Sequence, residues 1–444
     1  MQDPVVGNVT YPDDVPPMGH LIFDASNLGR VDEVSIAEYD IFIRPDTSNN
    51  KYRVWFYFEC QNSCENQRVI FNIVNFSKQR TLFENGIASP VVRPCTQNNW
   101  ARIPSRHIYY YRSAQHNDRW ILSFAYIFES SGPVQFAYCI PYTYGKLQSW
   151  LAELDRRDCA FYRRDLLTTT IQRRRIDLIT IDDNSESAMI GSTKKMVFIT
   201  ARVHPGESPS SFVLHGIVEF LLSCADRAQK LRKIFCFKII PMLNPDGVYQ
   251  GNYRNPSEWA HPSIYAVKQL LTQYDDNPQA CLELYIDLHA HSQKTNSFLY
   301  GNVSVPADNA SNRLVWLPHL LSTYADDYSL DYTQFNTDAE KEGTSRRTMG
   351  ELLSCLCFTM EVSFFSYRSV DSLGGQHITP YLQYKYEELG EALCKAILGF
   401  HEADCGIRQV SVSRPFHTFL PIKAQRSLKQ ASKAIRNMKN LVRT

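Results

Sequence analysis

The chain has 444 residues, of which 44% are hydrophobic and 21% charged, and its formal net charge is +1. This globular composition extends over more than the roughly 250–300 residues that one hydrophobic core usually serves, so we expect two domains. No apolar run reaches the roughly 18 residues of a transmembrane helix, so we expect no association with a membrane.

The N-terminal residues and the cysteines indicate the compartment. Met1–Thr10 lacks the basic segment and apolar core of a secretory signal. The twelve cysteines are therefore expected to be reduced thiols in the cytosol, and their spacing does not suggest a structural zinc ribbon.

The first third of the chain is predicted to be all-β. We assign residues 1–20 to a disordered N-terminus and residues 21–142 to a β-sandwich domain. Short runs of β-branched and aromatic residues alternate with polar turn clusters, which is typical of an antiparallel sandwich. The predicted strands are Tyr39–Arg44, Arg53–Glu59, Arg68–Asn75, Trp120–Tyr126 and Val134–Cys139. No nucleophile–base pair stands out, so we interpret this domain as a scaffold or substrate platform.

Residues 143–405 are predicted to form an α/β domain, with a sheet covered by helices. Helix-like and strand-like segments alternate here, and functional residues of such sheets gather in loops beyond the strand ends. The predicted helices are 146–156, 209–224, 262–274 and 380–400. The predicted strands are 176–182, 196–203, 234–243, 282–288 and 357–362.

A basic tail, residues 406–444, follows. Asp404 is the last acidic residue of the chain, and the tail is either a solvated terminus or a dock for an acidic partner. Its two phenylalanines are not interleaved with the basic residues as a base-stacking platform requires, so we expect no nucleic acid partner. The basic residues are Arg408, Arg414, Lys423, Arg426, Lys429, Lys433, Arg436, Lys439 and Arg443.

His204 and Glu207 form the most informative motif of the sequence. They lie between the apolar run Lys195–Val203 and a helix-like run in which Ser208 and Pro209 are good starting residues. An imidazole and a carboxylate three residues apart on such a turn can converge on one cation. A catalytic zinc site has three protein ligands and one water, so the motif predicts a third ligand further along the chain.

The third ligand is predicted at the end of the strand-like run Leu282–His289. His289 is the preferred candidate and His291 the alternative. Asp287 is a suitable partner to fix the orientation of the His289 ring.

Zinc hydrolases also need a base for the attacking water. Glu361 is a carboxylate inside the apolar run Phe358–Phe365, where a charge is costly unless it is paired or functional. We predict that Glu361 is this base. Arg254, which follows the turn at Asn244–Gly247, is predicted to stabilise the developing oxyanion.

These residues resemble those of the zinc carboxypeptidases of the carboxypeptidase A type. In the detailed sequence of the motifs, they resemble the cytosolic carboxypeptidases within that class. The resemblance extends from about residue 25 to residue 402. It rests on the order of several motifs: His204–Glu207, Asn244–Gly247, Gly251–Arg254, His289–Ser292, Gly343–Arg346 and Thr359–Glu361.

The resemblance implies a carboxypeptidase-like mixed sheet and one zinc ion held by His204, Glu207 and His289. It implies removal of glutamates from polyglutamate chains or acidic protein C-termini, with tubulin as the usual target. It also implies a cytosolic protein that reaches microtubule-based structures such as centrioles and cilia. Acidic substrates need basic contacts, for which Arg254, Lys341, Arg346 and Arg347 are candidates.

One departure from the family pattern leaves two alternatives open. The family carries an Asn-Arg pair that grips the substrate carboxylate, whereas here Arg254 is followed by the short stretch Asn255–Pro262. Since a bidentate arginine–carboxylate contact is strong and orienting, its loss favours a zinc-binding but catalytically impaired protein that acts by binding. The other alternative is an amidohydrolase for a small acyl amino acid.

Overall fold

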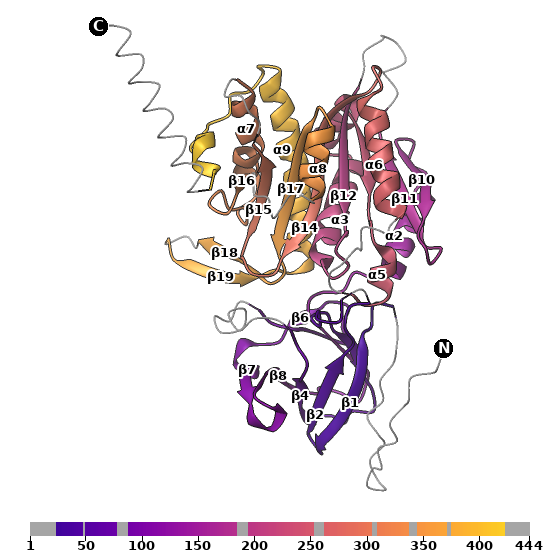
Figure 1. The fold of residues 1–444 in the computed structure, drawn as a ribbon, viewed down its shortest axis with the longest axis vertical. Coiled ribbons are helices and arrows are strands. Elements are labelled where there is room, and N and C mark those ends of the chain that lie inside the picture. Colours follow the sequence, from indigo (N-terminus) through magenta and orange to yellow (C-terminus); the bar gives the residue numbers. More distant parts are fainter. Residues whose placement is uncertain are drawn as a thin grey trace, which may run out of the picture.

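The computed structural model describes residues 24–47, 49–77, 88–183, 194–252, 262–303, 309–336, 344–370 and 374–421. A β-rich N-terminal part lies against one end of a larger α/β part (Figure 1). This architecture confirms the predicted fold class.

The N-terminal part contains two small sheets. The five-stranded sheet has the order β1-β2-β4-β8-β7, and the four-stranded sheet has the order β3-β9-β5-β6. Neighbouring strands are antiparallel, as predicted, except β2 and β4, which are parallel. The bounds are β1 Leu28–Ser35, β2 Glu38–Ile43, β3 Tyr57–Cys60, β4 Arg68–Ile73, β5 Val91–Pro94, β6 Ala101–Arg102, β7 Ile108–Ser113, β8 Arg119–Ile127 and β9 Val134–Ala137, with 3-10 turns at Ser105–His107 and Ala114–His116.

Aromatic rings fill the space between these two sheets. Phe71 in β4 lies 5.6 Å from Phe58 in β3 and 5.1 Å from Phe136 in β9, measured between ring centroids. Phe124 in β8 lies 5.8 Å from Phe136. All four rings are buried, and each such side chain contributes roughly 2–3 kcal/mol of burial free energy. The aromatic alternation seen in the sequence therefore forms a sandwich core.

The α/β part is built on an eight-stranded mixed sheet of order β10-β11-β13-β12-β14-β17-β15-β16. Its four central strands, β13, β12, β14 and β17, are parallel, so their carboxyl ends meet at one edge of the sheet. The bounds are β10 Tyr162–Thr169, β11 Arg175–Ile181, β12 Lys195–Ala201, β13 Phe235–Ile240, β14 Cys281–His291, β15 Ser297–Asn302, β16 Gln334–Asn336 and β17 Leu356–Ser363, with a separate hairpin of β18 Ser366–Val370 and β19 Gln376–Pro380.

Helices cover both faces of this sheet (Figure 1). Helices α3 and α9 pack closely, because glycines lie at their crossing. A Cβ on Gly216 would come within 2.0 Å of the Glu387 carbonyl oxygen, and one on Gly390 within 2.1 Å of the Val213 carbonyl oxygen. The bounds are α2 Tyr144–Arg156, α3 Ser208–Leu222, α4 Asp226–Ile234, α5 Pro245–Tyr249, α6 Pro262–Asp275, α7 Asn309–Tyr324, α8 Ser345–Leu352 and α9 Gln383–Asp404, with a 3-10 turn at Phe416–Phe419.

The N-terminal part contacts the segments that follow the central strands. The Arg102 guanidinium donates a hydrogen bond of 2.6 Å to the Phe364 carbonyl oxygen, just beyond β17. The Ser208 hydroxyl at the start of α3 donates one of 2.7 Å to the Ile140 carbonyl oxygen. These contacts brace the edge of the sheet to which the sequence assigns the metal ligands.

The first residues of the predicted basic tail pack onto the α/β part. Phe419 is buried, and its ring lies 5.8 Å from that of His319 in α7. Arg414 forms an ion pair of 2.9 Å with Asp331. The remaining basic residues of the tail, from Lys423 on, lie outside the described residues.

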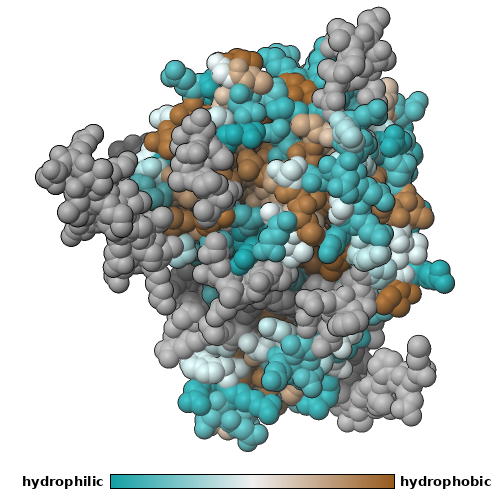
Figure 2. All heavy atoms as spheres, turned by 45° about the horizontal axis from the view of Figure 1, so that its top comes forward, coloured by the Kyte–Doolittle hydropathy of each residue, from teal (hydrophilic) through white to brown (hydrophobic). Residues whose placement is uncertain are grey.

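Among the described residues no single helix is long and apolar enough to cross a membrane. The pair α3 and α4, bent by 92° at its break, passes such a test by length and composition only. Figure 2 shows one face of the molecule, on which hydrophobic and hydrophilic residues interleave.

Candidate metal centre

A buried arginine shapes the loop that carries His204. Arg202 follows β12 directly, has a φ of 61°, and is 1% exposed. Its guanidinium donates to the Pro205 carbonyl oxygen from Nη2 at 2.6 Å and from Nε at 3.1 Å. Nη1 donates to the Tyr142 carbonyl oxygen at 3.0 Å and to the Ser211 hydroxyl at 2.9 Å. The loop is thus tied to both the N-terminal part and α3.

The Asn244–Gly247 turn packs directly against this loop. Asn244 caps α5, and its side-chain oxygen accepts a hydrogen bond of 3.0 Å from the Gly247 amide. Its side-chain amide donates to the Val203 carbonyl oxygen at 3.3 Å. A Cβ on Gly247 would lie 2.4 Å from Cγ of Pro205, so only glycine allows this close approach. The Asn244–Gly247 turn therefore helps to hold the loop that carries His204 in place.

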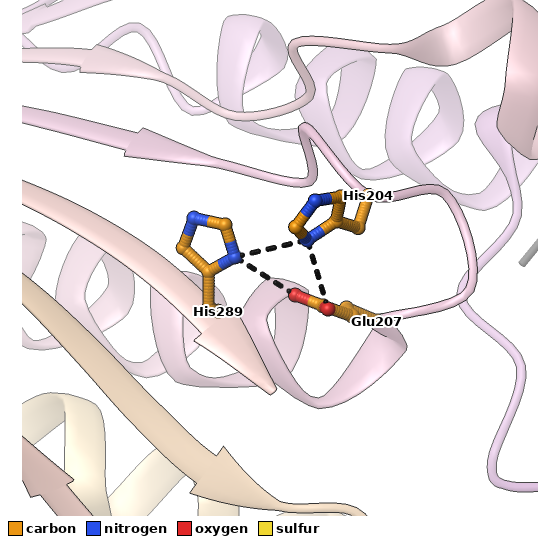
Figure 3. A group of neighbouring side chains, drawn as sticks. All are labelled: His204, Glu207 and His289. Atoms are coloured by element: carbon orange, nitrogen blue, oxygen red, sulfur yellow. Dashed lines mark hydrogen bonds and ion pairs between the residues drawn. The ribbon is translucent and has the colours of Figure 1, made fainter. Parts of the chain in front are cut away.

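His204, Glu207 and His289 converge on one point (Figure 3). His204 lies on the loop, Glu207 is the N-cap residue of α3, and His289 lies near the end of β14. Nδ1 of His204 lies 2.9 Å from one oxygen of Glu207, and Nδ1 of His289 lies 3.0 Å from the other. The two Nδ1 atoms are 3.1 Å apart.

The donor set fits a zinc ion. It consists of two imidazole nitrogens and one carboxylate oxygen, the ligand types that zinc prefers. Ligands at about 2.0–2.2 Å from a tetrahedral ion lie roughly 3.3–3.6 Å from each other, so small side-chain adjustments separate the observed cluster from that arrangement. The three ligands that the sequence predicts are thus brought together.

Asp287 fixes the orientation of His289, as the sequence predicts. It is fully buried and accepts a hydrogen bond from Nε2 of His289 at 2.8 Å, which leaves Nδ1 facing the cluster. The hydroxyls of Thr200 and Ser345 donate to the same carboxylate. Such a partner sets the tautomer of a ligating histidine and raises its basicity.

The charges of the cluster are strongly coupled. Burial alone would raise the pKa of Glu207, but His204 and His289 hold it well below its ordinary value. Burial would lower the pKa of His289, but the carboxylates of Asp287 and Glu207 raise it well above its ordinary value. Glu207 is therefore ionised, the form in which a carboxylate binds a metal. The Ala290 amide donates to Glu207 at 3.0 Å and supports the same form.

His291, the alternative third ligand, lies outside the cluster. Its Nδ1 accepts hydrogen bonds from the amides of Gln293 at 3.1 Å and Lys294 at 3.0 Å. Its ring packs against Phe298 with the centroids 5.4 Å apart. The structure therefore groups His289, and not His291, with the residues that could hold a metal ion.

Glu361 lies beside His289 on the neighbouring strand. The two residues are register partners in the parallel pair β14–β17, so their side chains leave the same face of the sheet. Tyr300 lies near the same carboxylate. Burial raises its pKa to about 12, the Glu361 carboxylate adds to this effect, and the Arg346 guanidinium opposes it. The predicted base thus stands next to a predicted zinc ligand.

Two of the four predicted basic contacts, Arg346 and Arg347, lie in α8. Arg254 and Lys341 lie outside the described residues. Arg346 is 2% exposed and donates hydrogen bonds to the Gly301 carbonyl oxygen at 2.8 Å and to the Asn336 side chain at 3.1 Å. Burial lowers its pKa to about 10, so it stays charged at neutral pH. Arg347 lies 3.5 Å from the Glu351 carboxylate on α8.

Comparison with known proteins identifies the family. Residues 147–259 match the family described as zinc carboxypeptidase, and residues 21–138 match the cytosolic carboxypeptidase N-terminal domain. Cytosolic carboxypeptidase 6 of Caenorhabditis elegans is 67% identical over 98% of this chain and 99% of its own length. The chain belongs to the cytosolic carboxypeptidase family. The resemblance found in the sequence is thereby confirmed, and the chain is a zinc metallocarboxypeptidase by family.

Other relatives of this carboxypeptidase agree. Human cytosolic carboxypeptidase 6 is 44% identical over 93% of this chain and 84% of its own length. A solved metallo-carboxypeptidase from Burkholderia cenocepacia has a TM-score of 0.72, with 19% identity, over 87% of this chain and 100% of that one. One from Pseudomonas aeruginosa has a TM-score of 0.70, with 21% identity, over 88% and 100%. The solved structures support the fold of both parts.

Sequence reasoning missed three supporting residues of the site. Arg202 was read as part of an apolar strand, although an arginine inside such a run is itself a signal of a buried polar contact. Thr200 and Ser345 meet Asp287 from β12 and α8, more than 50 residues away on either side of it in the sequence. No local pattern reports such contacts.

Proposed function

We propose that this carboxypeptidase removes glutamates from polyglutamate chains or acidic C-termini of cytosolic proteins such as tubulin. The observation that carries the proposal is the pairing of Glu361 with His289 across two adjacent strands, beside a group of three residues that could hold a metal ion. A metal centre and a carboxylate base on one face of the sheet are the two parts that metal-assisted peptide hydrolysis needs.

The reaction adds water to the terminal peptide bond. Zinc, when bound, lowers the pKa of its water toward 7 and polarises the scissile carbonyl group. Glu361 takes a proton from the attacking water and delivers it to the leaving amine as the C–N bond breaks. Asp287 keeps His289 turned toward the metal during this exchange. The oxyanion role of Arg254 stays a prediction from the sequence.

Buried positive charge near the base supports acidic substrates. The Arg346 guanidinium donates to the side chain of Asn302, which shares a face of β15 with Phe298 and Tyr300, so it lies on the same side of the sheet as Glu361. Because a charge acts over longer distances in the protein interior than in water, a buried guanidinium can attract a substrate carboxylate without lying on the surface. This electrostatic setting favours glutamate over neutral residues.

The proposed location and partner rest on the names of the relatives and on the charge of the tail. The similar proteins are named cytosolic carboxypeptidases, and we propose the cytosol for this chain as well. Polyglutamylated tubulin in centrioles or cilia would present dense acidic chains, for which the basic residues after Asp404 are a complementary dock.

The test is glutamate release by the zinc-loaded protein. Polyglutamylated tubulin is incubated with the wild type, with Glu361→Gln, and with Glu391→Gln, which removes a carboxylate from α9 as a matched control. Mass spectrometry should show stepwise loss of glutamate with the wild type and with Glu391→Gln, and almost none with Glu361→Gln. If wild type and Glu361→Gln are equally inert yet bind the acidic tails, the protein acts as the catalytically impaired binder instead.

A further inference from the structure

Three aromatic rings surround the ammonium group of Lys294 beside the candidate metal centre. Its Nζ lies 4.4 Å from the ring centre of Phe298, 5.3 Å from that of Tyr332 and 5.6 Å from that of Tyr300. The rings also hold one another, since Phe298 meets Tyr300 and Tyr332 edge to face at 5.4 and 5.9 Å. Cation–π contacts of this kind attract the ammonium group to the ring faces and hold it in position.

This aromatic cage (Phe298, Tyr300 and Tyr332) is aligned with the reacting groups. Phe298 in β15 is the register partner of Glu361, which is in turn the partner of His289. The three side chains therefore stand in one row on the same face of the sheet, about 4.8 Å apart from strand to strand. The Lys294 ammonium lies over the ring of Phe298, the outermost of these three side chains. The Lys294 backbone amide donates a hydrogen bond to Nδ1 of His291, so this histidine helps to position Lys294.

The two positively charged side chains near Glu361, Arg346 and Lys294, lie at different depths in the structure. Tyr300, the partner of Thr359, lies one row deeper toward the start of β17, and the buried Arg346 acts on this phenol. Lys294 is half-buried in the connection between β14 and β15, beyond the ends of both strands. An exopeptidase takes the residue that it releases into the inner part of its site and leaves the preceding residue at the rim.

We infer that Lys294 is a specificity-determining residue that binds the side-chain carboxylate of the glutamate preceding the released residue. This inference rests on the proposed function and narrows its substrate class to chains with two or more consecutive acidic residues at the end. Charge-assisted hydrogen bonds in a partly desolvated site are worth roughly 10- to 100-fold in binding.

The experiment compares two peptides that differ only in the penultimate residue, one ending in Glu-Glu and one in Gln-Glu. The proteins are the wild type, Lys294→Met, Lys294→Arg, and Lys268→Met, which removes an exposed lysine from α6 as a matched control. Methionine keeps the length and packs well on aromatic rings, so the fold is retained.

Wild type and Lys268→Met should prefer the Glu-Glu peptide about 10- to 100-fold in kcat/KM, mainly through KM. Lys294→Met should lose the preference while cleaving the Gln-Glu peptide as the wild type does, and Lys294→Arg should retain most of it. An unchanged preference in Lys294→Met overturns the inference.

A second measurement separates this inference from the proposed function. Fluorescence anisotropy with zinc-loaded Glu361→Gln, with and without Lys294→Met, reports the same preference as a ratio of Kd values without turnover. Binding that discriminates through Lys294, together with no glutamate release by the wild type, would reject the proposed function and keep the inference. Equal Kd ratios in both proteins would reject the inference alone.

Discussion

Replacing Arg202 by lysine should loosen the loop that carries His204. The arginine donates four hydrogen bonds to three acceptors, two of them to the Pro205 carbonyl oxygen in the fork arrangement that only a guanidinium provides. Burial lowers the pKa of Arg202 to about 10, so it is charged at pH 7. The same burial acting on a lysine, whose ordinary pKa is about 10.4, brings that group much closer to neutrality.

The magnitude follows from the bonds that are lost. A lysine ammonium can keep at most two of the three acceptors at these positions, and a hydrogen bond from a charged donor contributes roughly 1.5–3 kcal/mol. We therefore expect the free energy of unfolding to fall by about 3 kcal/mol. Since about 1.4 kcal/mol corresponds to a tenfold change in an equilibrium constant, loss of loop order should weaken zinc binding by about 10- to 100-fold.

Chelator competition gives the zinc affinity, and urea unfolding gives the stability. Arg232→Lys is the matched control, because Arg232 is also buried and donates to the carbonyl oxygens of Leu221 and Ser223 away from the site. Both variants should be destabilised, but only Arg202→Lys should lose zinc affinity. Equal zinc affinity in Arg202→Lys and Arg232→Lys would refute the role assigned to the loop.

Three further predictions follow. Asp287→Asn replaces the carboxylate that accepts from the His289 ring by a neutral amide and should weaken zinc binding by about 10- to 100-fold, so unchanged chelator competition would contradict it. Gly247→Ala places a methyl group against Pro205 and should cost about 1–3 kcal/mol in urea unfolding; an unchanged midpoint would show that the loop can yield. Burial raises the pKa of Asp327 from 3.8 to about 6, so the folded state binds this proton more tightly and stability falls as pH rises from about 4 to 6, by about 3 kcal/mol in all. Asp327→Asn should therefore gain stability over the wild type with rising pH, and a pH-independent difference would reject this reasoning.

The clustering of the three predicted metal ligands could be expected from the sequence because each occupies a locally recognisable place. His204 and Glu207 stand between an apolar strand and a helix start, and His289 ends another apolar run. In a parallel sheet the carboxyl ends of neighbouring strands share one edge, so residues 85 positions apart are expected to meet. What the sequence left open was the choice between His289 and His291, which depends on the course of the chain after β14.

Other features were not predictable from local patterns. Arg53–Glu59 was predicted as one strand, but β3 begins only at Tyr57. Trp55 is buried through side-chain contacts instead, and its ring nitrogen donates to the Ala25 carbonyl oxygen at 2.8 Å. The first part of this aromatic run therefore packs in the core without pairing with a neighbouring strand. Short elements such as α5 and β16 also escaped prediction, because three to five residues hold no measurable periodicity.

The central claim is that His204, Glu207 and His289 hold one zinc ion per chain. Elemental analysis of the purified protein by mass spectrometry measures it directly. We expect one zinc per chain in the wild type and in His291→Ala, and a large loss of zinc in His289→Ala. A full complement of zinc in His289→Ala, or its loss in His291→Ala alone, would contradict the assignment.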